Sequence, residues 1–142
     1  MPQRTWSTGP NVELTLFGED SSATPERLHG IIDTGASVIC VDSRVVKRLG
    51  LVASNKKLVQ MADGGTQMST IYAARMSIEA LGFDDMVEVY AIGMKSDAPT
   101  SRVLIGRSFL RNYIVNYDGP RERFEFHETN RGSEYYEFEH DE

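Results

Sequence analysis

One aspartate stands where its neighbours predict a buried strand. Asp33 directly follows Ile31 and Ile32, within the run "GIIDTGASVICV". Burying an ionised carboxylate without a partner costs several kcal/mol. A partly buried carboxylate is also a group that can take up or release a proton during catalysis. The stretch therefore predicts that Asp33 has a partner, a chemical role, or both.

The other aspartates, the histidines and the cysteine lie in sequence patterns that indicate no particular catalytic or binding site. Asp63 in "MADGG" and Asp118 in "NYDGP" lie in turn sequences. The three histidines, His29, His127 and His140, are too scattered for a ligand set, so we expect no metal and no cofactor. A single cysteine, Cys40 in "VICV", excludes an intrachain disulfide and is expected to be a small core residue.

The first half of the chain is organised as strands around a glycine-rich loop. Residues 11–17 alternate apolar and polar side chains, and residues 28–41 form extended chain interrupted at Gly35. A short helix over 44–51 is expected, with Ser43 as its cap and Gly50 at its end. Residues 58–80 read as a hairpin that turns at Asp63-Gly64-Gly65.

The second half predicts a strand at 86–92, a buried strand from Val103 that turns at Gly106, and a short helix after it. A last hairpin over 113–127 turns at Asp118-Gly119-Pro120. We expect an N-terminal arm at 1–10, one domain at 11–127 and an acidic, mobile tail at 128–142.

Composition narrows the class of protein. The chain has 142 residues and a formal charge of −6, without a large basic cluster, which disfavours a nucleic-acid partner. It has no apolar window of membrane-spanning length and no export signal. We expect a globular domain with no membrane contact through this chain, in the cytoplasm or in a compartment that the sequence does not specify, and possibly part of a larger protein.

Three segments together resemble a known family. "IIDTGAS", "QMADGGTQM" and "VLIGRSFL" occur in the order and approximate spacing of retropepsin-like aspartic proteases, the retroviral and retrotransposon type, with the "DTGAS" form of the loop. The resemblance covers most of residues 11–127. It implies an all-β fold, a closed single-lobe acid-protease barrel with one short C-terminal helix, and endopeptidase activity on extended polypeptides.

The resemblance also implies roles for individual residues. Asp33 is the catalytic residue, and Thr34, Gly35, Ala36 and Ser37 complete the active-site loop. Gly106 and Arg107 are expected to support this loop and the dimer region. The substrate-binding flap comprises Met61, Ala62, Asp63, Gly64, Gly65 and Thr66.

The chain carries only one apolar-apolar-Asp-Thr-Gly motif, whereas hydrolysis through a carboxylate pair needs two aspartates. Two carboxylates about 3 Å apart share one proton, an effect for which aspartic proteases are the standard example. The partner of Asp33 is therefore expected to be Asp33 of a second copy, across a two-fold axis. The homodimer also removes the cost of burying a lone charge.

One position departs from the family's viral members. Many of them carry an acid where Ser37 stands, and it pairs with the arginine that matches Arg107. Asp42 is a candidate to supply the missing charge. The alternative function is a catalytically weak or inactive peptide-binding and dimerisation module with the same fold. An aspartyl-phosphate enzyme is disfavoured, because threonine and glycine directly follow Asp33.

Overall fold

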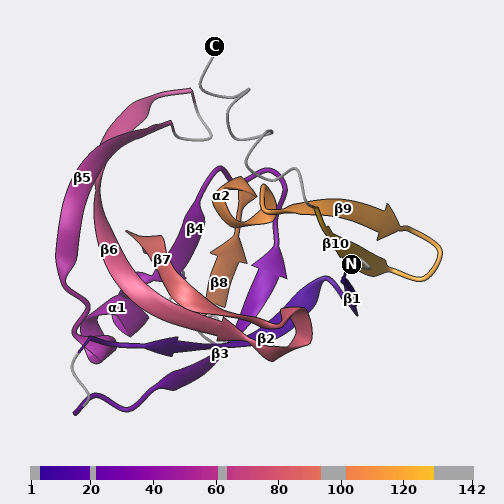
Figure 1. Cartoon of the computed structure of the whole chain (residues 1–142). Coiled ribbons are helices and arrows are strands. Elements are labelled where there is room, and N and C mark those ends of the chain that lie inside the picture. The colour runs from indigo at the N-terminus through magenta and orange to yellow at the C-terminus, as the bar shows by residue number, and fades with distance from the viewer. Residues whose placement is uncertain (1–3, 20–21, 61–63, 94–101, 130–142) are drawn as a thin grey trace.

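The computed structural model describes residues 4–19, 22–60, 64–93 and 102–129 (Figure 1). The described chain forms ten strands, two short α-helices and one 3₁₀ turn. In chain order these elements are β1 Thr5–Thr8, β2 Asn11–Phe17, β3 Glu26–Ile32, β4 Ile39–Asp42, α1 Ser43–Leu49, β5 Ala53–Gln60, β6 Thr66–Ile78, η1 Glu79–Leu81, β7 Phe83–Ile92, β8 Arg102–Ile105, α2 Arg107–Leu110, β9 Tyr113–Asp118 and β10 Arg123–Glu128.

Six strands close into a barrel in the order β2-β3-β8-β4-β7-β6, with β6 pairing back onto β2. The alternation predicted for residues 11–17 places Val12, Leu14 and Leu16 in the core. The partners of these residues in the core include Val41, Ile105 and other buried aliphatic side chains. The expected closed all-β barrel is confirmed.

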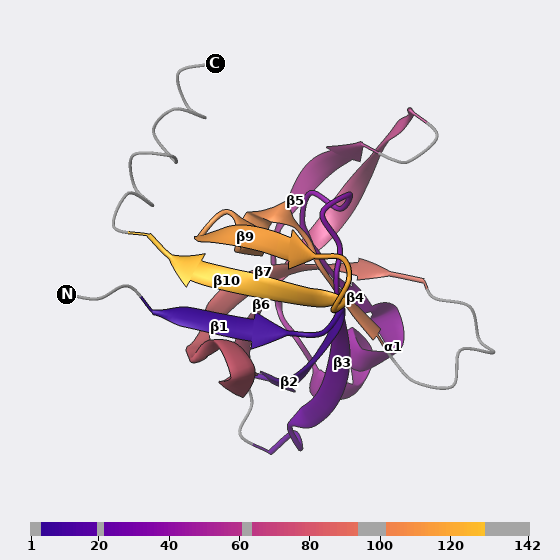
Figure 2. The ribbon, with the colours of Figure 1, turned by 90° about the vertical axis from the view of Figure 1, so that its right-hand side faces the viewer.

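Two structures extend from the barrel. β5 pairs only with β6 among the described strands, and the two form a long curved hairpin (Figure 1). β1, β10 and β9 form a separate three-stranded sheet, whose strands lie side by side in Figure 2. The sheet contacts the barrel through α2: Tyr113 of β9 packs against Phe109 of α2, and Phe109 packs against Phe83 of β7.

Local details differ from the sequence predictions at a few points. Asp42, and not Ser43, caps α1, because the Asp42 carboxylate accepts the Arg44 N–H at 2.9 Å. The hairpin begins at Ala53, earlier than residue 58, and ends in the η1 turn. Residues Thr5–Thr8, within the expected N-terminal arm, form β1 and pair with β10. The expected tail lies almost entirely outside the described residues.

The order of strands around the barrel explains how distant motifs meet. β8 lies between β3 and β4, parallel to the first and antiparallel to the second. The loop that joins β3 to β4, residues 33–38, must therefore pass over the end of β8. This topology brings the Asp33 motif against Gly106 and Arg107.

Candidate active site

The Asp33 loop, residues 33–38, continues directly from the β3–β8 ladder. Ile32 pairs with Ile105, and the Asp33 N–H donates to the Ile105 carbonyl at 3.0 Å. The backbone of Asp33 is thus held as an extension of the sheet, while its side chain is half-buried and leaves the core. A rigid backbone fixes the position of the carboxylate.

Within the described residues, one hydrogen bond reaches the Asp33 carboxylate. The Gly35 N–H donates to Asp33 Oδ1 at 2.9 Å. A Cβ at position 35 would lie 3.2 Å from that same oxygen, so glycine leaves room for this bond. The other carboxylate oxygen is available to a further donor.

The start of α2 is hydrogen-bonded to the Asp33 loop. The N–H groups of Arg107 and Ser108 donate to the carbonyls of Ala36 and Ser37, at 2.9 and 3.0 Å. A Cβ added at Gly106 would lie 2.6 Å from Ala36 O and closer still to Val38 O, so only glycine allows this approach. Gly106 and Arg107 therefore lie against the loop.

Arg107 and Asp42 have different partners from those considered for an ion pair. Arg107 Nη1 donates to the Thr34 carbonyl at 2.8 Å, which ties the guanidinium to the Asp33 loop of its own chain. Asp42 is fully buried and its carboxylate accepts from Arg44 Nε at 3.0 Å. The suggestion that Asp42 replaces the missing acid opposite Arg107 is wrong, because Arg44 already occupies that carboxylate.

The Arg44 guanidinium also lowers the pKa of Asp42, mainly through the hydrogen bond between the two side chains. Asp42 is thus an ionised, fully partnered structural residue. It caps α1 at the end of β4.

The flap residues expected from the resemblance are only partly within the described chain. Met61, Ala62 and Asp63 lie outside it. Gly64, Gly65 and Thr66 are described at the start of β6, and all three are exposed. Gly64 has φ +89, the left-handed conformation that the turn prediction required.

An apolar strip beside Asp33 was not predicted from the sequence. The barrel face opposite to the core carries four cross-strand neighbours, Ile31, Leu104, Cys40 and Tyr90. They alternate with the core residues Ile32, Ile105, Val41 and Val89. The buried Ile39 and Val41 leave the half-buried Cys40 on the other face, so the expectation that Cys40 is a core residue is wrong. All four residues of "VICV" are apolar, so the sequence gives no sign of which face lies in the core.

The environment of the Cys40 thiol includes the charge of the Asp33 carboxylate. Burial raises the pKa of the Cys40 thiol, and the negative charge of Asp33 raises it further. Burial also raises the pKa of the Tyr90 hydroxyl, next to Cys40 in the strip. The strip beside Asp33 consists of apolar and aromatic side chains, which suits contact with an apolar side chain.

Among the described residues, no group of three or more His, Cys, Asp or Glu side chains is placed to hold a metal ion. Over the same residues, no helix is long and apolar enough to cross a membrane.

Comparison with protein families identifies this arrangement. Residues 25–112, more than half of the chain, match the model of the gag-polyprotein putative aspartyl protease family. The chain belongs to this family. The matched segment of this aspartyl protease family member runs from β3 to the end of α2 and contains the Asp33 loop, the β5–β6 hairpin and Gly106-Arg107.

Solved structures similar to this aspartyl protease family member include the crystal structure of a retropepsin-like aspartic protease from Rickettsia conorii. The two chains are 14% identical, the alignment covers 90% of this chain and 96% of that one, and the TM-score is 0.47. A comparison with curated proteins found no match.

Proposed function

We propose that the protein is an aspartic endopeptidase of the retropepsin-like "DTGAS" type that acts as a homodimer. The observation that carries the proposal is the Asp33 carboxylate, held by Gly35 on a loop that the N-terminus of α2 supports from below. Membership in an aspartyl protease family supports a polypeptide substrate. The protease domain spans residues 11–127, between an N-terminal arm and an acidic tail.

In this mechanism Asp33 of each subunit contributes one half of the catalytic pair. A shared proton leaves one carboxylate able to accept a proton from water while the other donates one to the tetrahedral species. One carboxylate cannot do both at the same time. This requirement, together with the single motif in the chain, supports the dimer.

The neighbouring residues have positioning roles in the proposal. Thr34 bonds across the two-fold axis, and Gly35 fixes the Asp33 carboxylate through its N–H. Ala36 and Ser37 face the substrate, Arg107 braces the loop through the Thr34 carbonyl, and residues 61–66 close over the bound peptide. The exposed side of Thr34 and the half-buried Asp33 leave both available for these contacts.

Subunit mixing tests the proposal. Parent protein and Asp33→Asn protein are combined in equal amounts at low concentration, reconcentrated, and assayed on a peptide library. If the active pair spans two subunits, the activity falls to about a quarter of that of parent protein at the same total concentration. Only parent homodimers, about one quarter of all dimers, retain both carboxylates.

Once subunit exchange is complete, a fall to one half contradicts the shared pair, because it means that each chain acts alone. A parent protein that remains a monomer in sedimentation and cleaves no peptide favours the peptide-binding module. Arg107, which contacts its own chain at Thr34, would then serve the loop only.

A further inference from the structure

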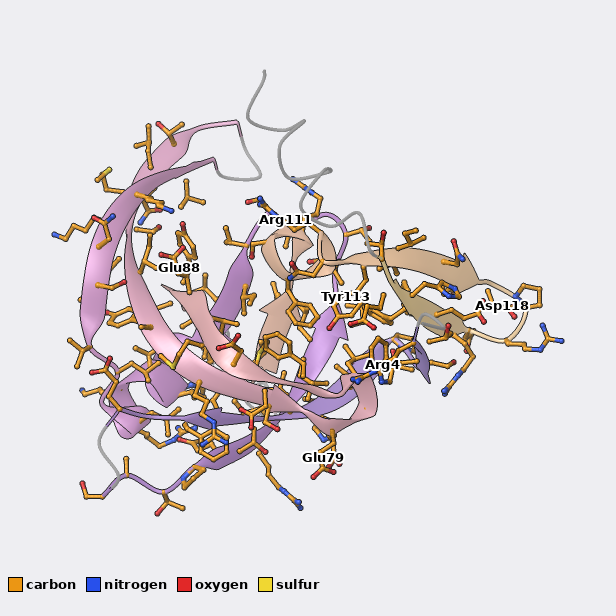
Figure 3. The ribbon with its side chains drawn as sticks, viewed as in Figure 1. Arg4, Glu79, Glu88, Arg111, Tyr113 and Asp118 are labelled. Atoms are coloured by element: carbon orange, nitrogen blue, oxygen red, sulfur yellow. The ribbon has the colours of Figure 1, made fainter. Side chains whose placement is uncertain are left out.

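A groove begins beside the Asp33 loop and leads away from it along one edge of β7. Its volume is about 540 Å³, which lies within the range of ligand-binding clefts. β7 forms one wall, and α2 with the residues after it forms the other; Glu88 and Arg111, labelled in Figure 3, belong to these two walls. We name it the β7 groove, and the lining residues that matter here are Val38, Phe83, Met86, Glu88, Ser108 and Arg111.

The strand that forms this wall has a free edge. β7 pairs with β6 from Phe83 to Tyr90, but with β4 only from Val89 onward. Over the described residues, the edge from Phe83 to Glu88 therefore has no second strand beside it. Free strand edges are the sites at which extended peptides add to a sheet.

Met86 marks the point where an added strand would bond. Its backbone N–H donates to the carboxylate of the adjacent Asp85 at 2.7 Å, an exposed and local interaction. The Met86 side chain is 52% exposed, although it is apolar and lies in the groove. A carbonyl of an incoming strand can replace Asp85 as the acceptor without breaking the β6–β7 ladder.

The near end of the groove adjoins the Asp33 site. Tyr90 lines the groove and is the cross-strand neighbour of Cys40, which belongs to the apolar strip beside Asp33. Lys57, from the β5–β6 hairpin, also lines it and lies 3.6 Å from Glu88. The groove therefore borders both the apolar strip beside Asp33 and the β5–β6 hairpin.

We propose that the β7 groove binds residues of an extended polypeptide substrate beyond those at Asp33, by adding them as a strand to the free edge of β7 at Met86. The inference rests on the proposed endopeptidase function, which supplies the occupant. The lining carries charges of both signs, Lys57 and Arg111 against Asp85 and Glu88. Backbone hydrogen bonds, and not one side-chain chemistry, therefore give most of the affinity.

The test uses two peptides and two variants of the full chain. The first peptide is an octapeptide recovered from a digested random library, and the second is the same sequence extended at both ends by Thr-Val-Thr-Val. Met86→Pro removes the outward N–H and spares the β6 ladder, because proline is tolerated on a free edge. Met86→Ala keeps that N–H and serves as the matched control.

We expect the parent and Met86→Ala to cleave the long peptide more efficiently than the octapeptide. Met86→Pro should lower kcat/KM for the long peptide about fivefold, the value of one net hydrogen bond, with the octapeptide unchanged. Equal cleavage of the two peptides by all three proteins overturns the inference but leaves the endopeptidase intact. Equal loss on both peptides in Met86→Pro also overturns it, because the substitution then acts on the whole fold.

A binding measurement separates the groove from catalysis. In the Asp33→Asn protein, the long peptide should slow hydrogen exchange of the Met86 amide, whereas the octapeptide should not. If the parent cleaves nothing, the endopeptidase proposal fails. Hydrogen exchange of the Met86 amide is then measured with the peptide Thr-Val-Thr-Val alone, and slower exchange shows that the groove binds an extended peptide. A Met86 amide that is already protected without peptide, by residues 130–142 or by a second copy, overturns the assignment to substrate.

Discussion

Asp33 and Asp42 stand at the two ends of one loop-and-strand segment, and their surroundings are opposite. Asp42 is fully buried, accepts bonds from the Arg44 backbone and guanidinium, and caps α1. Asp33 is half-buried and, among described residues, accepts only the Gly35 N–H. A carboxylate whose acceptor sites are filled stabilises the fold. A carboxylate that is rigidly placed but left with free acceptor capacity is available for chemistry.

The contrast between Asp33 and Asp42 is tested most directly by removing each charge separately. Asp33→Asn should lower peptide cleavage by about a thousandfold, within the usual contribution of a general acid–base group. Its free energy of unfolding should change by less than about 0.5 kcal/mol. The Asp33 side chain accepts one hydrogen bond, from the Gly35 N–H, and the amide oxygen of asparagine can accept the same bond. Peptide digestion and urea unfolding measure the two quantities. Activity retained in Asp33→Asn would remove Asp33 from the mechanism.

The support beneath the Asp33 loop gives the next largest effect. Gly106→Ala places a Cβ against the Ala36 and Val38 carbonyls, which cannot move without disturbing the loop. We expect a loss of about 3 kcal/mol in the free energy of unfolding, together with most of the activity. Gly93→Ala is the control, because a Cβ there meets no atom of the described residues within 4 Å. Equal stability of the two variants would mean that the loop is not held through Gly106.

Removal of the structural carboxylate should affect stability and not the chemistry. Asp42→Ala loses the α1 cap and leaves Arg44 without its partner, at a cost of about 2 kcal/mol. Asp84→Ala breaks the pair with Arg75, in which both side chains are about half exposed, and should cost much less stability than Asp42→Ala. Urea unfolding measures the loss of stability in each variant. An equal loss in both would contradict the conclusion that the buried Asp42 pair contributes more to stability than the exposed Asp84 pair.

The Asp42 pair also makes a pH prediction. Its lowered folded-state pKa means that the stabilisation is fully present above the unfolded value, about 3.9. The contribution is lost as the pH falls through the folded pKa. The difference in unfolding free energy between the parent and Asp42→Asn should stay constant from pH 7 to pH 5 and shrink below about pH 4.

The smallest effect concerns the thiol beside Asp33. Because the thiolate is the reactive form, the raised pKa of Cys40 should make its alkylation by iodoacetamide at pH 8 slower than that of a free thiol. Asp33→Asn removes one of the two causes, so the pKa should fall and alkylation should accelerate. Asp85→Asn is the control. An unchanged rate in Asp33→Asn would contradict the electrostatic contact between Cys40 and Asp33.

The sequence predicted elements that depend on local patterns. The alternation at residues 11–17 and the Asp-Gly-Gly turn gave β2 and the β5–β6 hairpin, because period and turn chemistry are local properties. Gly106 and Arg107 contact the Asp33 loop, and their supporting role in a catalytic site stays a prediction. The partner of Asp42 was not predicted, because a helix cap with an adjacent arginine is decided by the direction of one side chain.

The apolar strip and the β7 groove depend on strand register between distant segments. Cys40 meets Leu104 and Tyr90 only after β8 has entered between β3 and β4 and β7 has paired with β4. Hydrophobicity alone does not reveal which of two faces a residue in "VICV" occupies. A register, once known, fixes the face of every side chain in a strand.

The position of β8 between β3 and β4 has a consequence for synthesis of the protein. The Asp33 loop receives its supports from Ile105 to Ser108, and Arg107 is separated from Thr34 by 73 residues. Contacts between such distant segments form late and slowly. A nascent chain that has emerged only as far as β7 already contains Asp33 but lacks residues 105–108, whose backbone positions the Asp33 loop. The Asp33 loop can therefore reach its final geometry only after β8 and α2 have been synthesised.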